Sequence, residues 1–600
     1  MGMRHSTRRL AISVVAGACI AVVACRAEAD TELQRRLQSL SLRYADRAAT
    51  LLDKSSGAFR DPFETIYGEG YGPACAAVVA AEAYRWTADA RYCELAVSLI
   101  ERAFLLVRNP QPYNSTFTHL FLMYYSLLAY EALADELPAS TRLHLEEEFR
   151  DIAHGREPTN TNGLTMLLCY DVNRALLGLG TWDALDAQRR LDMLRSAVGT
   201  SGFINDAPGR NSQPVAYHLY VTCLLTDTIA LAAKRPPTDQ SLCGIIDAMT
   251  GIRNAAAAWC DRFIAADGSF TMTERSRDQF WTCGSLAFVE AALGRSADRH
   301  VDWWARFVKS DGTISVTPNF FSNALRVGFE SYSNVSMYNG LGFAYLARAA
   351  ALLERTDTTR SWDVEEDMVF VDRDAGYAHV RRSGSSLGIA LRRHAESYYG
   401  GYAAPLSPIN VSLGGSRRRP LANPSYRSAG ARVESWRTRS VAPEHGVYEG
   451  FLVRRGDQWL GADWTTNASV EEGPKELVFT AESGPVGITK HLALDASALS
   501  LRYRFKVAKP IDEIRVQFPM LVSDGRDDTV YSVERNCVTM SLGEERYRLT
   551  VLPEHAHWDV SQVVYLTSTS GAVRQLSARI SGPLSAGQSA ECEVQLERLE

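Results

Sequence analysis

The feature that most constrains the fold is a change of pattern near residue 360. Before it, apolar residues recur at helical spacing, as in GPACAAVVAAEAYRW, FTHLFLMYYSLLAYEAL and VSMYNGLGFAYLARAAALL. After about residue 365 the apolar segments are short, often alternate with polar residues and end at turn residues, as in GYAHVRR, LSLRYRFKV and RYRLTVL. The sequence therefore predicts a helical half followed by an antiparallel β half, joined near the charged stretch LLERTDTTRSWDVEED.

The helical half mixes two kinds of helix. Some segments are amphipathic, and others are apolar nearly all round and must be buried on most of their faces. A ring of inner helices enclosed by outer helices provides both environments. We therefore expect an (α/α) toroid over residues 30–362 and an antiparallel β-sandwich over residues 363–600.

The first 29 residues have the pattern of a signal peptide. Arg4, Arg8 and Arg9 precede an apolar stretch that is too short to span a membrane as a mature helix. The residues Val-Val-Ala-Cys that end at Cys25 resemble a bacterial lipobox, which predicts a lipid anchor in the outer membrane. Ala-Glu-Ala ending at Ala29 is a rival cleavage site, which would release the protein into the periplasm.

Charge and cysteine content restrict the binding partners. The formal net charge is -6, so the chain has no basic excess and nucleic acid is not an expected partner. Nine cysteines follow Cys25, an odd number without a CxxC motif, and most lie in apolar helical context. This favours buried free thiols over a disulfide framework or a zinc site.

Polar residues gather where apolar helices begin. The segment NSQPVAYHLYVTCLL, residues 211–225, carries Gln213, Tyr217 and His218 in its first turns. The free N–H groups of a helix start favour anionic ligands, so these side chains are candidates for binding an acidic group. The alternative is a capped helix with a half-buried tyrosine and histidine.

Four further clusters have the same character. Each can also be explained without a ligand, by helix capping, by solvated ion pairs or by packing in the sandwich. The clusters are Asn160 and Asn162; Arg275, Arg277 and Gln279; Tyr338 with its neighbours; and His394, Tyr398, Tyr399 and Asn410.

Amide, phenol, imidazole and guanidinium groups without an obvious nucleophile suit β-elimination on a uronate. The proton on C5 is weakly acidic, so an amide or arginine must hold the carboxylate and stabilise the charge that develops beside it. A tyrosine or histidine takes this proton, and a tyrosine or histidine protonates the departing O4. Since tyrosine has a pKa of about 10, a tyrosine base needs a nearby positive charge, which Arg275 or Arg277 could supply.

QPVAYH on a predicted inner helix and GYAHVRR at the start of the sandwich make the chain resemble the heparinase II/III-like polysaccharide lyases and their alginate-lyase relatives. The resemblance covers nearly the whole mature chain and implies an exported lyase that acts on an acidic polysaccharide. Those families carry a His- and Asp-containing motif early in the sandwich, often linked to a metal. Here that place reads YYGGYAAPLSPINVSL, with His394 as the nearest candidate, so we expect no required metal or other cofactor.

The residues and the resemblance together define the predicted site. The predicted catalytic residues are Tyr217, His218, Asn162 and His394, and the predicted substrate-binding residues are Asn160, Gln213, Arg275, Arg277, Gln279, Tyr338, Tyr398 and Tyr399.

Two other functions fit the same architecture. A glycoside hydrolase would need two carboxylates across a cleft, and the available residues are Glu69, Asp171, Asp267, Glu274 and Asp278. A non-catalytic glycan-binding lipoprotein would use aromatic loops such as ETIYGEGYGP.

Overall fold

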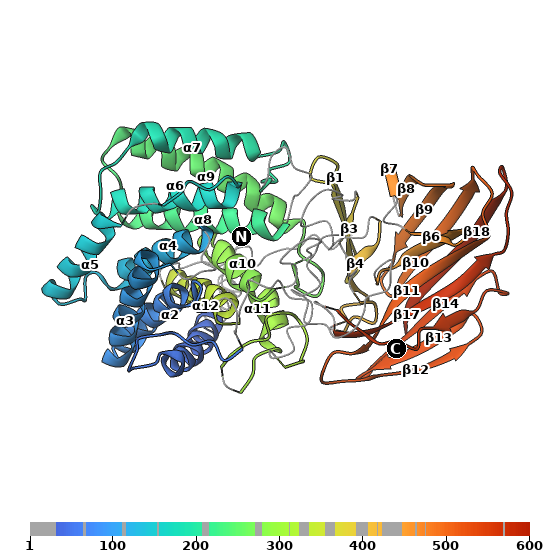
Figure 1. Ribbon diagram of the computed structural model, residues 1–600, viewed down its shortest axis with the longest axis horizontal. Helices are drawn as coiled ribbons and strands as arrows, with labels where there is room; N and C mark the ends of the chain where they lie inside the picture. The colour runs from blue at the N-terminus through green and yellow to red at the C-terminus, as the bar shows by residue number, and fades with distance from the viewer. Residues whose placement is uncertain are drawn as a thin grey trace, which may run out of the picture.

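The structure, a computed structural model, has helices first and antiparallel strands after them (Figure 1). It describes residues 32–63, 68–110, 116–152, 155–206, 215–270, 279–310, 312–322, 335–354, 367–391, 406–416, 418–422, 447–461, 465–473, 476–567 and 571–599. The predicted signal peptide with Cys25 and the predicted domain boundary at residue 362 lie outside these ranges.

Six helices form a closed inner ring, which confirms the predicted toroid. They are α2 (Gly72–Thr87), α4 (Thr116–Leu133), α6 (Thr161–Leu176), α8 (Val215–Lys234), α10 (Trp281–Ala292) and α12 (Val335–Leu353). Each packs on the next, and α12 packs back on α2.

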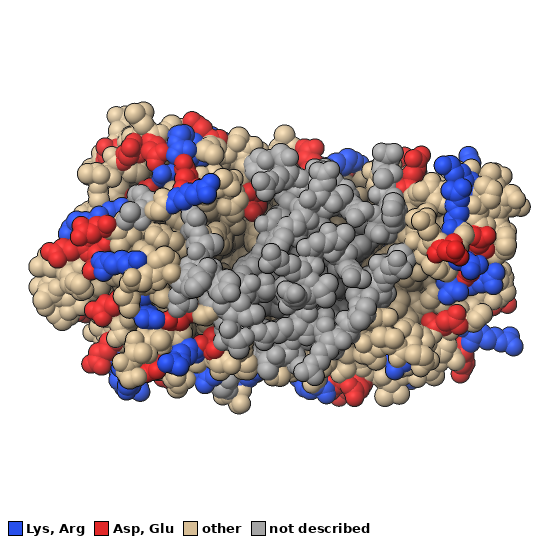
Figure 2. Space-filling view, in the orientation of Figure 1, with Lys and Arg blue, Asp and Glu red and all other residues tan. Residues whose placement is uncertain are grey.

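A second layer of helices surrounds the ring. It consists of residues 32–51, α3 (Ala90–Arg108), α5 (Ala139–Asp151), α7 (Ala184–Ala197), α9 (Gln240–Asp261) and α11 (Asp298–Ala305). The inner helices α2 and α10 are buried over most of their length, whereas α5 and α7 bury one face and carry charged residues on the other. On the described part of the face in Figure 2, basic and acidic side chains are interspersed.

Helix α8 is long and apolar enough to cross a membrane by length and composition, the one such helix among the described residues. However, 83% of its apolar stretch is buried inside the protein. The helices α6, α9 and α10 pack against it. Its apolar character is therefore explained by its place in the inner ring.

Glycine permits the close contact of α10 with α12. A Cβ atom added to Gly284 would lie 2.0 Å from the carbonyl oxygen of Gly342. A Cβ atom added to Gly342 would lie 2.7 Å from the ring of Phe280. The two backbones therefore meet at a distance that leaves no space for a side chain.

The described strands of the β half form three antiparallel sheets. The first has the order β1 (Met368–Asp372), β2 (Tyr377–Arg382), β3 (Ser385–Ala390) and β4 (Pro408–Ser412). The second has eight strands: β12 (Thr529–Glu534), β13 (Cys537–Leu542), β14 (Glu545–Leu552), β18 (Ser589–Leu599), β10 (Ala498–Val507), β9 (Val486–Leu494), β8 (Glu476–Ser483) and β7 (Thr465–Glu472). The third has the order β15 (Trp558–Val560), β17 (Gly571–Ser581), β11 (Glu513–Ser523), β5 (Gly450–Arg455) and β6 (Gln458–Gly461), with β16 (Tyr565–Thr567) beside β17.

The two larger sheets share one core, as a sandwich requires. Buried and less buried residues alternate along β9 and β10, so one face of the eight-stranded sheet is apolar. Phe505 of this face meets Phe451 of β5 with ring centroids 5.7 Å apart. The prediction of an antiparallel sandwich is thus confirmed, and the four-stranded sheet is an addition to it.

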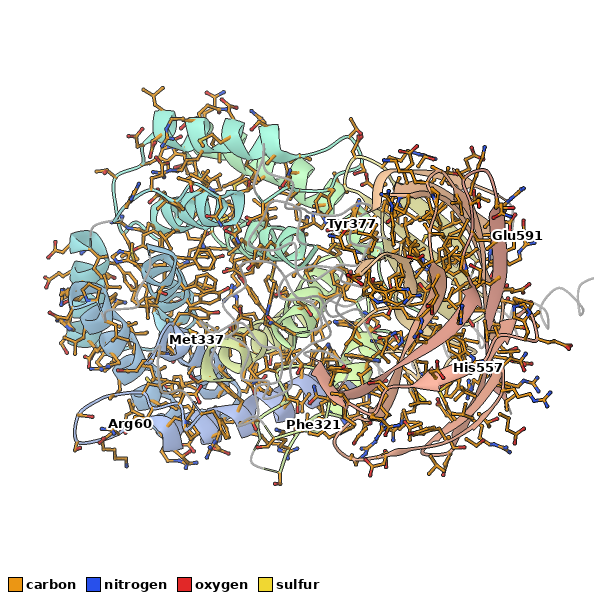
Figure 3. The ribbon with its side chains drawn as sticks, turned by 45° about the vertical axis from the view of Figure 1, so that its right-hand side comes forward. Arg60, Phe321, Met337, Tyr377, His557 and Glu591 are labelled. Carbon is orange, nitrogen blue, oxygen red and sulfur yellow. The ribbon has the colours of Figure 1, made fainter. Side chains whose placement is uncertain are left out.

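The four-stranded sheet lies between the toroid and the larger sheets (Figures 1 and 3). Phe370 and Tyr377, the latter labelled in Figure 3, belong to the apolar core of the toroid. Their rings lie 6.1 and 6.4 Å from Trp259. Ala378 and Ile389 belong to the core of the β half. The sheet therefore joins the two halves through apolar contacts on both sides.

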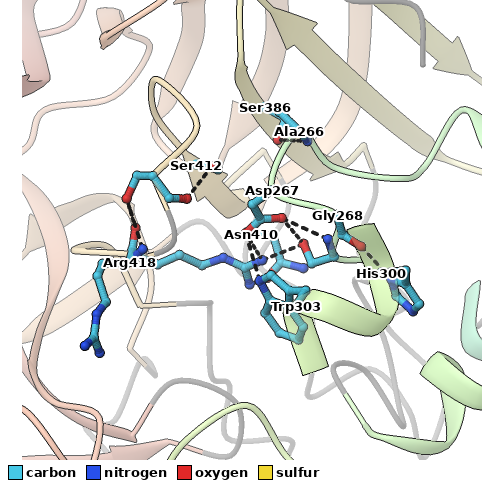
Figure 4. A network of polar contacts seen from close by, with 12 residues as sticks. Ala266, Asp267, Gly268, His300, Trp303, Ser386, Asn410, Ser412 and Arg418 are labelled. Carbon is cyan, nitrogen blue, oxygen red and sulfur yellow. Dashed lines mark hydrogen bonds and ion pairs between the residues drawn. The ribbon is translucent and has the colours of Figure 1, made fainter. Parts of the chain in front are cut away.

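A buried ion pair also joins the halves, in the network of Figure 4. The carboxylate of Asp267 accepts hydrogen bonds from Arg419 at 2.8 Å and from the indole of Trp303 at 3.1 Å. Arg419 also donates to the side-chain oxygen of Asn410 at 2.8 Å. Burial raises the pKa of Asp267, but the Arg419 guanidinium and the hydrogen bonds from Ser269 together outweigh burial and hold that pKa below its usual value. We call Asp267 and Arg419 the interdomain pair.

Candidate active site

The inner helices begin at the end of the ring that faces the four-stranded sheet. Gly72 and Ser336 are neighbours at the starts of α2 and α12. Ser201, in the loop that leads to α8, donates to Asp372 of β1 at 2.5 Å. Helix starts expose N–H groups and carry the positive end of the helix dipole. This end of the ring therefore favours a negatively charged ligand.

Farther along the inner helices, charged side chains fill the ring. Arg348 of α12 donates to Asp227 at 2.6 Å and to Glu131 at 3.2 Å. Asp227 also accepts from the phenol of Tyr124 at 3.0 Å. Because this interior is occupied by a buried ionic cluster, the start of the ring is the better location for a ligand site.

Four tyrosines gather at the start of the ring: Tyr71, Tyr217, Tyr220 and Tyr338, here called the tyrosine cluster. The pKa of Tyr71 is raised well above its usual value by burial and, to a smaller extent, by neighbours that include the other three phenols. Tyr217 is half-buried, and the other three side chains are buried. The structure thus brings the predicted residues Tyr217 and Tyr338 together from different helices.

A strip of aromatic rings adjoins the tyrosine cluster. The ring of Phe121 lies 4.2 Å from that of Tyr71 and 5.5 Å, parallel, from that of Tyr220. Phe117, which is partly exposed, lies 4.7 Å from Phe121. Flat apolar rings of this kind can pack against the C–H faces of a sugar.

Asn160 and Asn162 lie side by side at the start of α6, which packs against α8. The amide of Asn160 donates to the side-chain oxygen of Asn162. The backbone N–H of Asn162 donates to Asp206 at 2.9 Å, shortly before α8 in the chain. Asn160 is half-buried and Asn162 is buried, so Asn160 is the more accessible of the two to a ligand.

Gln279 joins the site through Trp281. Its side-chain oxygen accepts from the indole of Trp281 at 2.9 Å. The Trp281 ring meets Tyr220 edge-on with centroids 5.7 Å apart. Gln279 is buried at the start of α10, where it supports the aromatic surroundings of the tyrosine cluster.

His218 occupies a different environment from the predicted one. Its Nδ1 accepts from the backbone N–H of Ile204 at 2.9 Å, and its Nε2 lies 3.1 Å from the carbonyl oxygen of Ala256. Burial lowers the pKa of His218 to about 3. Both ring nitrogens are engaged with backbone, so we correct the catalytic assignment of His218 to a structural role.

The remaining predicted residues lie outside the described residues and stay predictions. They are Gln213, Arg275, Arg277, His394, Tyr398 and Tyr399. The positive charge that a tyrosine base requires therefore still rests on the prediction for Arg275 or Arg277.

The structure corrects the reading of Asn410, and the segment around it does not fit a metal. Asn410 is fully buried, and its side chain accepts from Arg419 instead of facing a ligand. The described residues 406–416 contain no carboxylate, imidazole or thiol. Within the described ranges, His, Cys, Asp and Glu form no group of three that could hold a metal ion. We derive no step through a metal.

Sequence reasoning missed Tyr71, Phe121 and Tyr220. Tyr220 lies three residues after Tyr217, so helical spacing places the two near each other and could have identified it. Tyr71 lies in the loop ETIYGEGYGP, which we considered only for glycan binding. Its contact with the other phenols depends on ring closure between α2 and α12, which no local pattern reveals.

Solved structures share this arrangement of ring and sheets. A crystal structure of heparinase III matches with a TM-score of 0.53 at 12% identity, over 88% of this chain and 76% of that chain. The chain has the fold of heparinase III. A second heparinase III structure matches with a TM-score of 0.50 at 9% identity, over 87% and 77% of the two chains. A mutant of a heparan sulfate lyase from Pedobacter heparinus gives a TM-score of 0.46 at 10% identity, over 100% of this chain and 92% of that chain.

No protein-family model matches the sequence, and no curated protein matches it either. At 9–12% identity, the likeness to the heparinase III structures concerns the fold.

Most of the carboxylates that a hydrolase could use in this fold are bound in ion pairs with arginines. Glu69 accepts from Arg102 at 2.9 Å and from the backbone N–H of Phe59 at 2.7 Å. Asp171 is paired with Arg190, and Asp267 belongs to the interdomain pair. Glu274 and Asp278 lie outside the described residues. These ion pairs disfavour three of the five candidates as hydrolytic acids or bases.

Proposed function

We propose that the chain is a polysaccharide lyase that cleaves a uronate-containing polysaccharide by β-elimination. The observation that carries the proposal is the tyrosine cluster at the start of the inner ring. Two of its members, Tyr217 and Tyr220, lie on α8, which packs against the helix that begins with the Asn160–Asn162 pair. Phenols and amides are the groups that this reaction needs. The fold shared with heparinase III supports the same class of enzyme.

In the proposed reaction the uronate carboxylate binds at the helix starts, held by the amide of Asn160 or Asn162. The phenolate of Tyr217 removes the proton from C5. The electron pair of that C–H bond forms the C4–C5 double bond as the bond from C4 to O4 breaks. O4 then takes a proton from a neutral phenol. Tyr71 suits this last step because burial raises its pKa and keeps it protonated.

The direct test is a screen of purified protein against alginate, glucuronan, glycosaminoglycans and bacterial exopolysaccharides. β-Elimination leaves a double bond conjugated with the carboxylate, so we expect ultraviolet absorbance to rise with at least one substrate. New reducing ends without this absorbance would indicate a hydrolase instead. The absence of both across the panel would favour a glycan-binding protein.

We further propose that the protein is exported and held on the outer membrane through Cys25, in residues outside the described ranges. The support for this proposal is the sequence Val-Val-Ala-Cys, which stands at the end of the apolar stretch and finishes at Cys25. We expect the wild type to fractionate with membranes and Cys25→Ser to be released from them. A wild type that is already fully soluble in the periplasm would contradict lipidation and favour cleavage after Ala29.

A further inference from the structure

The outer face of the six-stranded sheet carries three arginines and a tryptophan on four adjacent strands. Side chains alternate along a strand, so Arg454 of β5 points to this face because its neighbour Val453 lies in the sandwich core. Residues directly opposite each other in paired strands share a face. The pairing therefore places Trp459 of β6 and Glu513 of β11 beside Arg454 on the outer face. Arg515 lies there too, two residues after Glu513.

Arg579 of β17 completes the set. It is exposed and lies directly opposite Arg515. We call Arg454, Trp459, Arg515 and Arg579 the arginine strip. Neighbouring strands are about 4.8 Å apart, so a strip across four strands is about 14 Å long. This length is greater than that of one sugar ring and suits a short run of linked sugar units.

The arginine strip has more positive charge than its carboxylate partner can neutralise. Arg454 and Arg515 both form an ion pair with the same carboxylate, that of Glu513. The side chain of Arg579 has no hydrogen bond or ion pair to any residue in the described part of the chain. Three guanidinium groups are therefore accompanied by one carboxylate, which leaves two positive charges in excess on this face.

The pairing of Arg515 with Arg579 is unfavourable unless an anion binds there. Like charges directly opposite each other in paired strands destabilise a sheet. A carboxylate between the two guanidinium groups would accept hydrogen bonds from both and remove the repulsion. The side chain of Arg515 is 33% exposed and that of Arg579 is exposed as well, so a ligand can reach this position.

Trp459 adds an apolar surface next to these charges. The guanidinium carbons of Arg515 and Arg454 lie 5.2 and 5.8 Å from the centre of its ring. Stacking restricts both arginine side chains without using all of their N–H groups. Trp459 is still partly exposed, and a flat aromatic ring can pack against the C–H face of a sugar.

We propose that the arginine strip is a second polysaccharide-binding site, which holds a short run of acidic sugar units. The guanidinium groups bind the carboxylates, and the tryptophan packs against a sugar ring. The strip lies on four strands of the six-stranded sheet, whereas the tyrosine cluster lies in and beside the inner helices, so the two sites share no residue. The inference rests on the proposed function, because it takes an acidic polysaccharide as the ligand.

The test uses fluorine NMR of the full-length protein labelled with 5-fluorotryptophan and titrated with a glucuronan trisaccharide. The Trp459 signal is identified by its loss in Trp459→Phe. We expect the trisaccharide to shift this signal in a saturable way, and neutral cellotriose and inorganic phosphate to shift it far less. Arg579→Gln should weaken the binding of the trisaccharide by about tenfold or more, because it removes a charge-assisted hydrogen bond. Since Arg579 is exposed, this variant should fold like the wild type.

Arg504→Gln is the matched control, since Arg504 is an exposed arginine on the outer face of the eight-stranded sheet, paired with Glu591. It should leave the titration unchanged, as should Tyr217→Phe. A Trp459 signal that does not move, that moves equally with cellotriose or phosphate, or that responds in Arg579→Gln as in the wild type would overturn the inference. Failure of the proposed function is a separate result, because it would appear as the absence of unsaturated products, whatever the Trp459 signal does.

Discussion

Tyr217 and His218 are adjacent in the first turn of α8, and their side chains leave the helix about 100° apart. Tyr217 lies with the phenols of the inner ring. His218 stacks on Phe203 at 4.8 Å and meets the edge of Trp259, also at 4.8 Å, on the side of α9. At the scale of single residues, this difference in direction makes Tyr217 the catalytic candidate and His218 a structural residue.

Replacing Tyr217 by Phe keeps the ring and removes the hydroxyl. If Tyr217 exchanges a proton with the sugar, turnover on a cleaved polysaccharide should fall by about 10²–10⁴-fold while substrate binding persists. Tyr345→Phe is the control, because its buried hydroxyl accepts from Tyr125 at 2.9 Å, deeper in the ring. Steady-state kinetics of both variants checks this, and near-normal turnover of Tyr217→Phe would return Tyr217 to a packing role.

Three buried histidines should make the fold sensitive to acid. Burial lowers the pKa of His218 and of His379 to about 3, and that of His300 to about 4. In the unfolded chain these groups titrate near 6.5, so their stabilising contribution is complete above that pH and is lost as the pH falls toward the folded values. Between about pH 7 and about pH 5 we expect a loss of about 2 kcal/mol for each histidine.

Urea unfolding at the two pH values measures this loss. His218→Gln should lower the stability at neutral pH and reduce its dependence on pH, because one titrating group is removed. His144→Gln, at an exposed position in α5, should leave the pH dependence as in the wild type. An unchanged dependence in His218→Gln would contradict the assignment of a buried neutral imidazole.

At the scale of elements, the crossing of α10 and α12 depends on Gly284. A methyl group there would meet the backbone of Gly342, which cannot move aside as a flexible side chain can. We expect Gly284→Ala to lower the free energy of unfolding by about 3 kcal/mol.

The matched control is Gly244→Ala in the second turn of α9, where an added Cβ meets nothing within 4 Å. Alanine has the higher helix propensity, so this variant should gain up to about 1 kcal/mol. Chemical denaturation of both variants makes the comparison. Equal stabilities for the two variants would contradict a close crossing at Gly284.

The sequence predicted most helices and strands because the spacing of apolar residues that marks each one lies within a single short segment of the chain. The apolar character of α8 follows from burial on nearly all of its faces, and the alternation in β9 and β10 follows from burial of one face of each strand. The separate four-stranded sheet could not be predicted in this way, because the pairing of strands depends on contacts between distant segments that no single segment encodes. Likewise Tyr217 could be selected from its helix start, whereas the partners of His218 and Asn410 come from other segments.

At the scale of the whole molecule, the interdomain pair couples the toroid to the β half. Asp267→Asn would leave Arg419, whose side chain is 12% exposed, without its buried counter-charge. Breaking a buried pair in this way costs about 3–5 kcal/mol. We therefore expect calorimetry to show a lower transition temperature or two separate transitions.

Asp192→Asn is the control for this prediction. Asp192 is an exposed residue of α7 that is paired with Arg195 at 3.0 Å. Surface pairs contribute about 0–1 kcal/mol, so this variant should unfold like the wild type. If the calorimetric transition of Asp267→Asn matched those of the wild type and Asp192→Asn, the interdomain pair would not couple the two halves.

The central claim, β-elimination, is tested most directly by the mass of the products formed in water enriched in oxygen-18. A lyase adds no water across the bond that it breaks, so the new uronate end should carry a double bond and neither product should contain the heavy oxygen. A hydrolase adds one water, so a product that carries oxygen-18 at the cleaved bond and no double bond would contradict the account.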